Sequence, residues 1–306
     1  MFGHRPDGKV VKNLPGLFKI IPMIMPQRND AQVLFDYDIR IAKMDEYMDK
    51  VKAEKGINLS YLDIFFATIV RIFSERTNLN RFVVNQRIYQ RNQITISLVI
   101  KKGLSDDAEE TPLKFNFKGN ETIFEIKEKV EKIIQENKSE DAANGTDNLV
   151  SKLNAIPTPI LKKVVWFLKW LDKHGMLPKS IIDIIPFHTS AFVTNVGSIG
   201  IDAIYHHLYN FGTTSMFLGI GRKKKNYLYD DDEIKEEKCI NLKFVGDERI
   251  CDGVYYANSF KLLSKYLRKP ELLEQPGENI YDVNELIALN KKKKKTKHQI
   301  EKEIKK

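Results

Sequence analysis

The stretch Cys239-Ile-Asn-Leu-Lys-Phe-Val-Gly-Asp-Glu-Arg-Ile-Cys-Asp-Gly-Val-Tyr-Tyr-Ala257 decides the fold of this chain. Apolar residues alternate with polar ones over 239–245, which predicts a strand. Asp252-Gly253 predicts a turn, and helical spacing of apolar residues predicts a helix over 254–267. A strand end and a helix start hold the polar loop between them in a fixed position, so we expect the chemistry of the chain there.

The loop and one earlier segment carry a resemblance to a known family. Asp247-Glu248-Arg249-Ile250-Cys251-Asp252-Gly253 resembles the signature Asp-His-Arg-x-x-Asp-Gly of dihydrolipoyl acyltransferase catalytic domains, the cores of 2-oxoacid dehydrogenase complexes. Ala191-Phe-Val-Thr-Asn-Val-Gly197 resembles the family segment Phe-Thr-Ile-Ser-Asn-Leu-Gly. The resemblance spans residues 20–137 and 188–273, and its main departure is Glu248, where the family has its general-base histidine.

The resemblance implies an α+β fold of the chloramphenicol acetyltransferase type, in which helices cover a mixed β-sheet. We expect an acyltransferase-like domain over 33–273 that contains a helical insertion over 138–190. An N-terminal extended arm over 1–32 and a Lys-rich tail over 274–306 are expected to flank it.

The resemblance also implies transfer of an acyl group from a coenzyme A thioester to a small acceptor, in a channel between the subunits of a homotrimer. Glu248 takes the position of the base, and Thr194 of the neighbouring subunit takes that of the hydroxyl that binds the oxyanion. Asp252 is expected to order the loop by pairing with an arginine, for which Arg249 is the local candidate. The remaining site-orienting positions are Gly253, Asn195 and Gly197.

The glutamate leaves two functions open. A glutamate titrates near ~4.3 and a thiol near ~8.5, so proton transfer between them is mismatched unless burial raises the pKa of the carboxyl group. Loss of general-base catalysis costs roughly 10²–10⁴ in rate. The alternative to a working enzyme is therefore a catalytically degenerate homologue that binds coenzyme A esters or assembles with partners.

Composition indicates a soluble cytoplasmic protein. The chain has 306 residues, of which 42% are hydrophobic and 30% charged. No apolar run reaches the ~20 residues of a membrane span, so a membrane partner is not expected, and two cysteines fit a reducing compartment. The spacing of His and Cys predicts no metal site, and no lipoyl domain is recognised. Residues 291–306 hold nine lysines and two glutamates, so most of the net charge of +9 lies in the tail and predicts no specific nucleic-acid surface.

The segment Ile160–Leu171 inside the insertion is strongly apolar with interspersed lysines. Three interpretations remain open for it. Trp166 and Trp170 pack on the sheet or on a neighbouring subunit, or the segment forms a lid over the substrate channel. The third is an amphipathic helix at a membrane surface.

Local signals place the other elements. We predict a strand over 33–41, a helix that ends at Gly56, and a further helix opened by a capping box at Ser60–Asp63. A second capping box, at Thr122–Glu125, predicts another helix. Strands over 82–89 and 94–100 are expected to form a hairpin. The histidines that might replace the base are interpreted as ordinary ones: His188, and His206-His207 on a helix after the Thr194 segment.

Overall fold

The computed structural model describes residues 5–103, 105, 110–139, 144–230 and 233–289. Its centre is a mixed sheet of six strands in the order β2-β9-β8-β7-β5-β6, in which β7 runs parallel to both β5 and β8 and the other pairs are antiparallel. The strands of this sheet are β2 (Gln32–Arg40), β5 (Ile94–Lys101), β6 (Glu110–Phe117), β7 (Ala191–Asn195), β8 (Met216–Asp230) and β9 (Glu233–Asp247). A smaller sheet contains β1 (Gly8–Val10), β4 (Arg87–Arg91) and β3 (Arg81–Val84) in that order.

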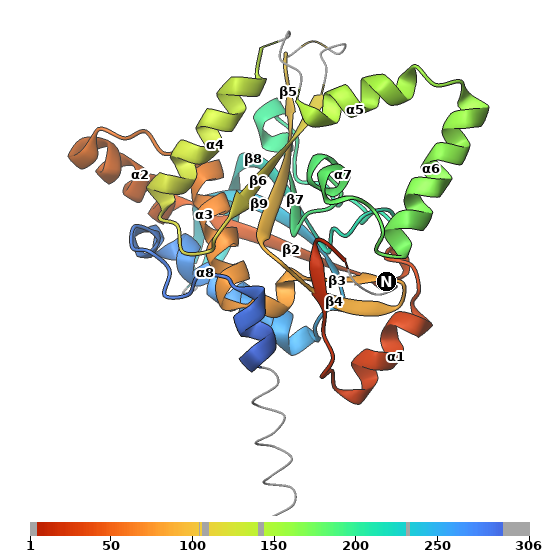
Figure 1. Cartoon of the computed structure of the whole chain (residues 1–306). Helices are drawn as coiled ribbons and strands as arrows, with labels where there is room; N and C mark the ends of the chain where they lie inside the picture. The colour runs from red at the N-terminus through yellow and green to blue at the C-terminus, as the bar shows by residue number, and fades with distance from the viewer. Residues whose placement is uncertain (1–4, 104, 106–109, 140–143, 231–232, 290–306) are drawn as a thin grey trace, which may run out of the picture.

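One face of the main sheet is covered by helices that share a single hydrophobic core with it (Figure 1). These helices are α2 (Ala42–Lys55), α3 (Tyr61–Glu75), α4 (Ile123–Asn137) and α8 (Gly253–Arg268). Short 3-10 turns lie at η1 (Asn29–Ala31), η2 (Thr77–Asn80), η3 (Val196–Ile199) and η4 (Pro270–Leu273). The mixed sheet covered by helices confirms the predicted fold class.

The helix boundaries follow the sequence signals. Ser60 accepts a hydrogen bond from the backbone of Asp63, whose carboxylate accepts one in return, and Thr122 and Glu125 form the same arrangement before α4. Gly56 adopts the left-handed conformation (φ 70°) that ends α2. Both predicted capping boxes and the predicted helix end are therefore confirmed.

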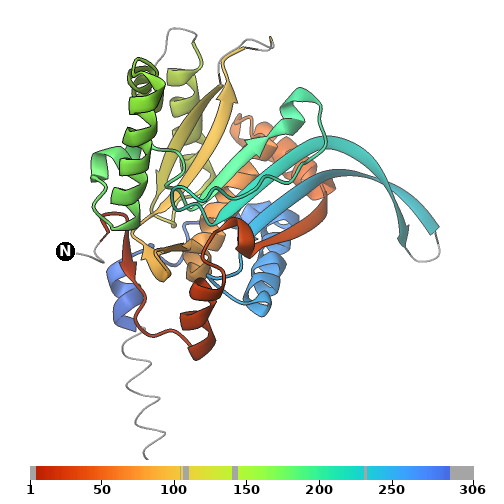
Figure 2. The same cartoon turned by 90° about the vertical axis from the view of Figure 1, so that its right-hand side faces the viewer.

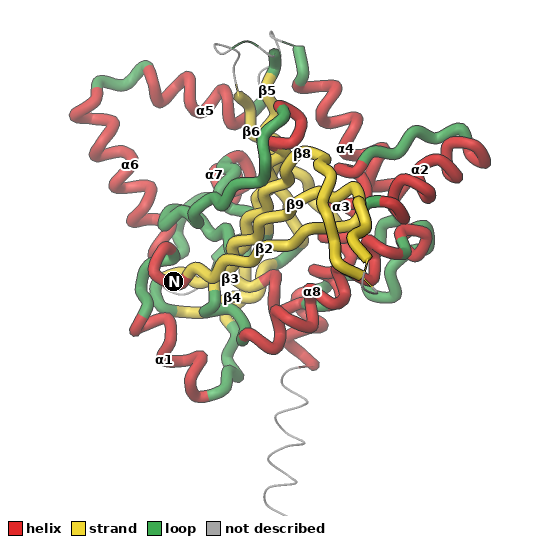
Figure 3. Tube along the Cα trace, turned by 180° about the vertical axis from the view of Figure 1, so that it is seen from behind, coloured by secondary structure: helices red, strands yellow, loops and turns green. Residues whose placement is uncertain are grey.

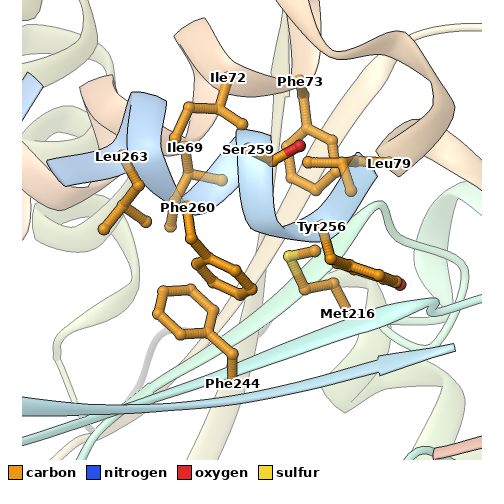
Figure 4. A pocket seen from close by; sticks show the side chains of 10 residues that line it. All are labelled: Ile69, Ile72, Phe73, Leu79, Met216, Phe244, Tyr256, Ser259, Phe260 and Leu263. Atoms are coloured by element: carbon orange, nitrogen blue, oxygen red, sulfur yellow. The ribbon is translucent and has the colours of Figure 1, made fainter. Parts of the chain in front are cut away.

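The core between α3, α8 and the sheet contains a small void of about 20 Å³ (Figure 4). Phe73, Phe244 and Phe260 are among its lining, and nearly all of the lining is apolar. An apolar void of this size stays dry, and it is far too small for a substrate. It is a packing feature of the core and not a candidate site.

Figure 3 shows the opposite face of the main sheet. Phe192, Phe217 and Val245 project from β7, β8 and β9 on this face and pack with Leu208. The chain over 201–209 crosses this face without regular secondary structure, so the prediction that His206 and His207 lie on a helix is wrong. The helix is replaced by an extended crossing because the glycines of β8 let the backbone lie close against the sheet.

The predicted insertion consists of three helices, α5 (Gly145–Asn154), α6 (Thr158–Lys173) and α7 (Lys179–Ile184). Figure 1 shows α5 and α6 forming an open frame at the edge of the molecule, on the side where α1 (Gly16–Ile24) also lies. Within this edge, Arg5 binds Asp172 of α6 at 2.8 Å and Lys114 donates hydrogen bonds to the carbonyls of Ile182 and Ile185. Buried polar contacts thus attach the insertion to the body.

Other sequence predictions are corrected by the structure. Residues 82–89 are not one strand, because Asn85 and Gln86 adopt positive φ angles (49° and 59°) and form a two-residue turn between β3 and β4. The expected hairpin with 94–100 is absent, since β5 pairs with β6 and β7. The expected N-terminal extended arm instead contains β1 and α1.

The tail also begins later than predicted. Tyr281 and Val283 are buried, and the Tyr281 hydroxyl donates a hydrogen bond to the carbonyl of Arg91. Residues 290–306 lie outside the described part of the chain.

The strands β8 and β9 extend beyond the sheet as a two-stranded arm (Figure 2). Pairing with β2 ends at Cys239 and pairing with β7 ends at Ile220, whereas β8 and β9 continue to pair with each other to Asp230 and Glu233. At the base of the arm the backbone of Arg222 still bonds to Ile201 and that of Lys238 to Ile41, and further out the two strands pair with each other.

Candidate active site

Thr194 lies near the end of β7, beside Gly219 of the parallel strand β8. It is half-buried and on the same sheet face as Phe192. The chain over 201–204 runs directly across this face. A Cβ atom at Gly219 would lie 2.6 Å from the carbonyl oxygen of Ile204, and one at Gly221 would lie 2.4 Å from the backbone nitrogen of Ala203. Glycine is thus required on β8 to admit the backbone next to Thr194.

The turn after Thr194 is also closely packed. Asn195 ends β7, and a Cβ atom at Gly197 would lie 2.3 Å from the carbonyl oxygen of Gly221. The two site-orienting residues predicted here, Asn195 and Gly197, therefore lie in a turn that fixes the direction in which β7 ends. This gives Gly197 a structural reason to be glycine within the chain itself.

Glu248 follows β9 in a loop that a buried ion cluster holds in place. Arg249 donates two hydrogen bonds to the carboxylate of Asp247, at 2.8 and 2.7 Å, and a third at 2.9 Å to the carbonyl of Met25. Arg28 lies 3.7 Å from the same carboxylate. Burial lowers the pKa of Arg28 to about 10, although Asp247 acts in the opposite direction. The backbone N–H of Glu248 donates to the carbonyl of Ala31, so both sides of the loop are tied to the segment 25–31.

Asp252 does not pair with Arg249 as predicted. Its carboxylate accepts a hydrogen bond at 2.7 Å from the backbone N–H of Tyr255 and so caps the start of α8, while the guanidinium of Arg249 is used by Asp247 and by backbone carbonyls. Arg249 pairs with Asp247 because both side chains are buried at the end of β9, whereas Asp252 is exposed. Asp252 still orders the loop, but as a helix cap.

Gly253 has no neighbour that explains it. A Cβ atom built there meets nothing within 4 Å, and the residue has no positive φ angle. The next residue, Val254, is 71% exposed. The first turn of α8 is therefore exposed to solvent beside the loop.

Cys251, His188 and His206 lie in surroundings that affect their protonation. Burial raises the pKa of Cys251 to about 12, so its thiol stays protonated. His188 is buried between Asp7 and Asp172, at 3.6 and 3.8 Å, and its burial lowers its pKa. His206 stacks on Phe217 with ring centres 4.5 Å apart. The interpretation of these histidines as ordinary ones stays a prediction, because the buried Nε2 atoms of His188 and His206 have no hydrogen-bond partner among the described residues.

Thr194 and Glu248 do not meet within one chain. Thr194 pairs with Gly219 of β8, and Gly219 pairs in turn with Lys243 of β9. Glu248 lies five residues after Lys243, just beyond the end of β9. Two strand spacings and five residues of strand separate them by roughly 20 Å. The structure brings Glu248 together with Arg249, Asp252 and Gly253, and Thr194 with Asn195 and Gly197, as two separate groups.

Sequence reasoning missed Arg28. It lies in a segment rich in proline that gave no sign of a buried charge, yet it donates hydrogen bonds to three backbone carbonyls, those of Tyr209, Val83 and Gly212. A cleft of about 740 Å³ opens beside Arg28 and Arg249 and extends to α6. In the described residues, no group of three or more His, Cys, Asp or Glu side chains is arranged to hold a metal ion, and no helix is long and apolar enough to cross a membrane.

A comparison with models of known protein families tests the resemblance seen in the sequence. Residues 188–274, which include Thr194 and the whole loop 247–253, match the model of the 2-oxoacid dehydrogenases acyltransferase catalytic domain. The predicted resemblance is confirmed. No curated protein matches the chain.

Solved structures of this acyltransferase family share the fold. A probable dihydrolipoamide acetyltransferase from Listeria monocytogenes is similar with a TM-score of 0.53 and 16% identity, over 89% of this chain and 99% of that one. The dihydrolipoamide acetyltransferase of Azotobacter vinelandii also gives a TM-score of 0.53, with 11% identity over 87% and 94% of the two chains. A chloramphenicol acetyltransferase gives 0.50 and 10% identity over 85% and 99%. The chain therefore has the fold of an acyltransferase catalytic domain.

Proposed function

We propose that this chain is a coenzyme A-dependent acyltransferase whose active site is shared between two subunits of a homotrimer. The observation that carries the proposal is the placement of the two family segments. Thr194 and Glu248 are both half-buried at the surface and stand at different ends of the sheet. A site that needs both must therefore be completed by a second copy.

In this proposal Glu248 accepts the proton of an acceptor thiol, and the sulfur attacks the carbonyl carbon of the acyl thioester. The Thr194 hydroxyl of the neighbouring subunit donates a hydrogen bond to the oxyanion that forms. Collapse of the tetrahedral intermediate breaks the bond between the acyl carbon and the sulfur of coenzyme A, and the leaving thiolate takes the proton from Glu248. Asp252 keeps the loop in place by capping α8.

A solved relative supports these positions. The structure of the Azotobacter vinelandii acetyltransferase concerns the role of a serine, a histidine and an asparagine in its catalytic mechanism, and the histidine and asparagine are four residues apart. Glu248 and Asp252 have the same spacing, and Thr194 supplies the hydroxyl earlier in the chain. Cys239 and Cys251 are both free, which supports a reducing, cytoplasmic location.

The second candidate is a degenerate homologue that binds coenzyme A esters or assembles without turnover. It is favoured by one observation, the glutamate in place of the histidine base. The two candidates differ in what Glu248 does, and not in fold, family or subunit arrangement.

The deciding experiment incubates the protein with acetyl-CoA and a panel of thiol and amine acceptors and follows release of free coenzyme A thiol. For a working enzyme, Glu248→Gln lowers kcat by roughly 10²–10⁴, and Thr194→Val by roughly 10²–10³. Glu278→Gln, at an exposed carboxylate, is the matched control and leaves the rate unchanged.

The same assay recognises the alternative. Absence of turnover in the wild-type protein, together with activity in Glu248→His, establishes the degenerate homologue. The native mass is a separate check, because a monomer in solution contradicts a shared site in either case.

A further inference from the structure

Helix α1 exposes an apolar face to solvent. Leu17, Ile20 and Ile24 follow the spacing of one helical face, and Leu17 and Ile24 are 63% and 68% exposed. Met23 beside them is also exposed. A surface helix of a soluble domain normally buries such a face. This exposed face therefore indicates an unfilled contact.

Helix α6 has the same character. Its body-facing stripe is made of half-buried residues, namely Leu161, Val164, Leu168 and Leu171. The opposite face carries Trp166, which is 65% exposed, and Trp170, which is 37% exposed. Within one chain the two tryptophans therefore do not pack on the sheet, and their packing on a neighbouring subunit stays a prediction. Lysines surround them on the exposed surface of the helix: Lys162, Lys163, Lys169 and Lys173.

The two helices border one cleft. The cleft of about 740 Å³ is lined by Pro26, Gln27 and Arg28, directly after α1, and by Trp166 and Trp170 of α6. Figure 1 places α1 and α6 along the same edge of the molecule, and Figure 2 turns that edge to the viewer. The two helices therefore lie on one side of the protein.

The exposed charges of the two helices themselves are all basic. Residues 12–28 contain Lys12, Lys19 and Arg28 and no acidic residue. The only carboxylate of α6 is Asp172, which is buried and bound to Arg5. A second copy that presented the same surface would bring lysines against lysines. Apolar and tryptophan side chains fringed by lysines instead suit the boundary between lipid headgroups and acyl chains, with phosphates beside the ammonium groups.

We propose that α1 and α6 together dock the protein on the surface of an anionic lipid bilayer. The helices lie in the plane of the headgroups, with Leu17, Ile20, Ile24 and Trp166 inserted and the lysines at the phosphates. Such docking needs no spanning helix, so it does not conflict with the absence of an apolar run of spanning length. It is independent of the proposed acyl transfer.

Intrinsic fluorescence offers a direct test, because the only two tryptophans of the chain are both on α6. The full chain is mixed with vesicles of phosphatidylcholine alone or of phosphatidylcholine with phosphatidylglycerol, and then sedimented. We expect cosedimentation and a blue shift of the tryptophan emission with the anionic vesicles only. Both effects weaken at high salt, because the attraction between the lysines and the phosphates is screened.

Variants locate the contact. Each of Lys162→Ala and Lys169→Ala is expected to weaken binding roughly fivefold, the effect of one lysine near an anionic surface. Two further variants are expected to reduce binding more strongly, because they remove inserted apolar area. They are the double variant Ile20→Ser with Ile24→Ser and the single variant Trp166→Ser. The control is Ile234→Ser, at a 73% exposed residue on the two-stranded arm of β8 and β9, and it leaves binding unchanged.

Three results overturn the proposal. One is equal binding to neutral and anionic vesicles, or no binding. Another is cosedimentation without an emission shift, which assigns the attraction to the Lys-rich residues 291–306. The third is an oligomer whose tryptophans are already shielded from acrylamide without lipid, because a second copy then covers α6.

Discussion

The loop that bears Glu248 and the edge formed by α1 and α6 satisfy their side chains in opposite ways. In the loop, the charges of Asp247 and Arg249 are buried and paired with each other. Along the edge, apolar side chains such as Trp166 are exposed, and buried polar contacts such as the pair of Arg5 with Asp172 hold the insertion to the body. The loop of the candidate site is thus held by contacts within the chain, whereas the exposed apolar side chains of the edge suit a surface outside the chain.

The largest effect is expected from breaking the ion cluster of the loop. Arg249→Met removes both guanidinium hydrogen bonds to the buried carboxylate of Asp247, which keeps only the backbone N–H of residue 249 and the more distant Arg28, at 3.7 Å. Loss of one partner of a buried pair costs about 3–5 kcal/mol, because the remaining charge is not compensated. Urea unfolding measures the change.

The double variant Asp247→Asn with Arg249→Met is the control for this prediction, and it recovers part of the loss because it removes the uncompensated charge. A loss below about 1 kcal/mol in the single variant would mean that the loop does not depend on the cluster.

A smaller effect, visible as a pH dependence, is expected where the insertion meets the body. Burial lowers the pKa of Lys114 to about 7, and Arg91 acts in the same direction, while Asp183 and Asp7 oppose it. The unfolded chain therefore binds more protons than the folded one between pH ~7 and ~10.4, and stability rises with pH in that window.

Lys114→Met tests this by flattening the rise, although it also leaves the carbonyls of Ile182 and Ile185 without their donor. Unfolding free energies measured across the window show the slope. Lys261→Met, at an exposed lysine of α8, keeps it. An unchanged slope in the Lys114 variant would assign the pH dependence to other groups.

The smallest effect is expected at Asp252. Asp252→Ala removes the cap of α8 and lowers stability by about 1 kcal/mol, which thermal unfolding detects. Asp252→Asn retains an acceptor for the N–H of Tyr255 and restores most of the loss. If the asparagine variant is as unstable as the alanine variant, the negative charge matters beyond the cap.

Local signals in the sequence were sufficient for much of the fold. The helices that begin after Ser60 and Thr122 could be predicted, because a capping box involves only four neighbouring residues. The strand, loop and helix around Glu248 were predicted for the same reason. The turn at Asn85-Gln86 was missed, because neither residue is the glycine that usually marks positive φ angles.

The partners of charged residues were harder to predict, because they depend on the folded chain. Asp247 and Asp252 both lie within three residues of Arg249, and spacing alone does not tell which of them is buried with it. Arg28 meets Asp247 from more than two hundred residues away. The roles of Glu248 and Thr194 remain predictions, since they depend on a second copy of the chain.

The two-stranded arm of β8 and β9 has a consequence for how the molecule responds to its medium. One strand of the arm is basic over Arg222 to Lys225. The other carries Glu233, Glu236 and Glu237 together with two lysines, and Lys225 binds Glu236 across the strands at 2.7 Å. An isolated pair of strands is only marginally stable in water, and ions weaken such exposed attractions. Concentrated electrolyte should therefore fray this projection first, while the six-stranded platform beneath it keeps its shape.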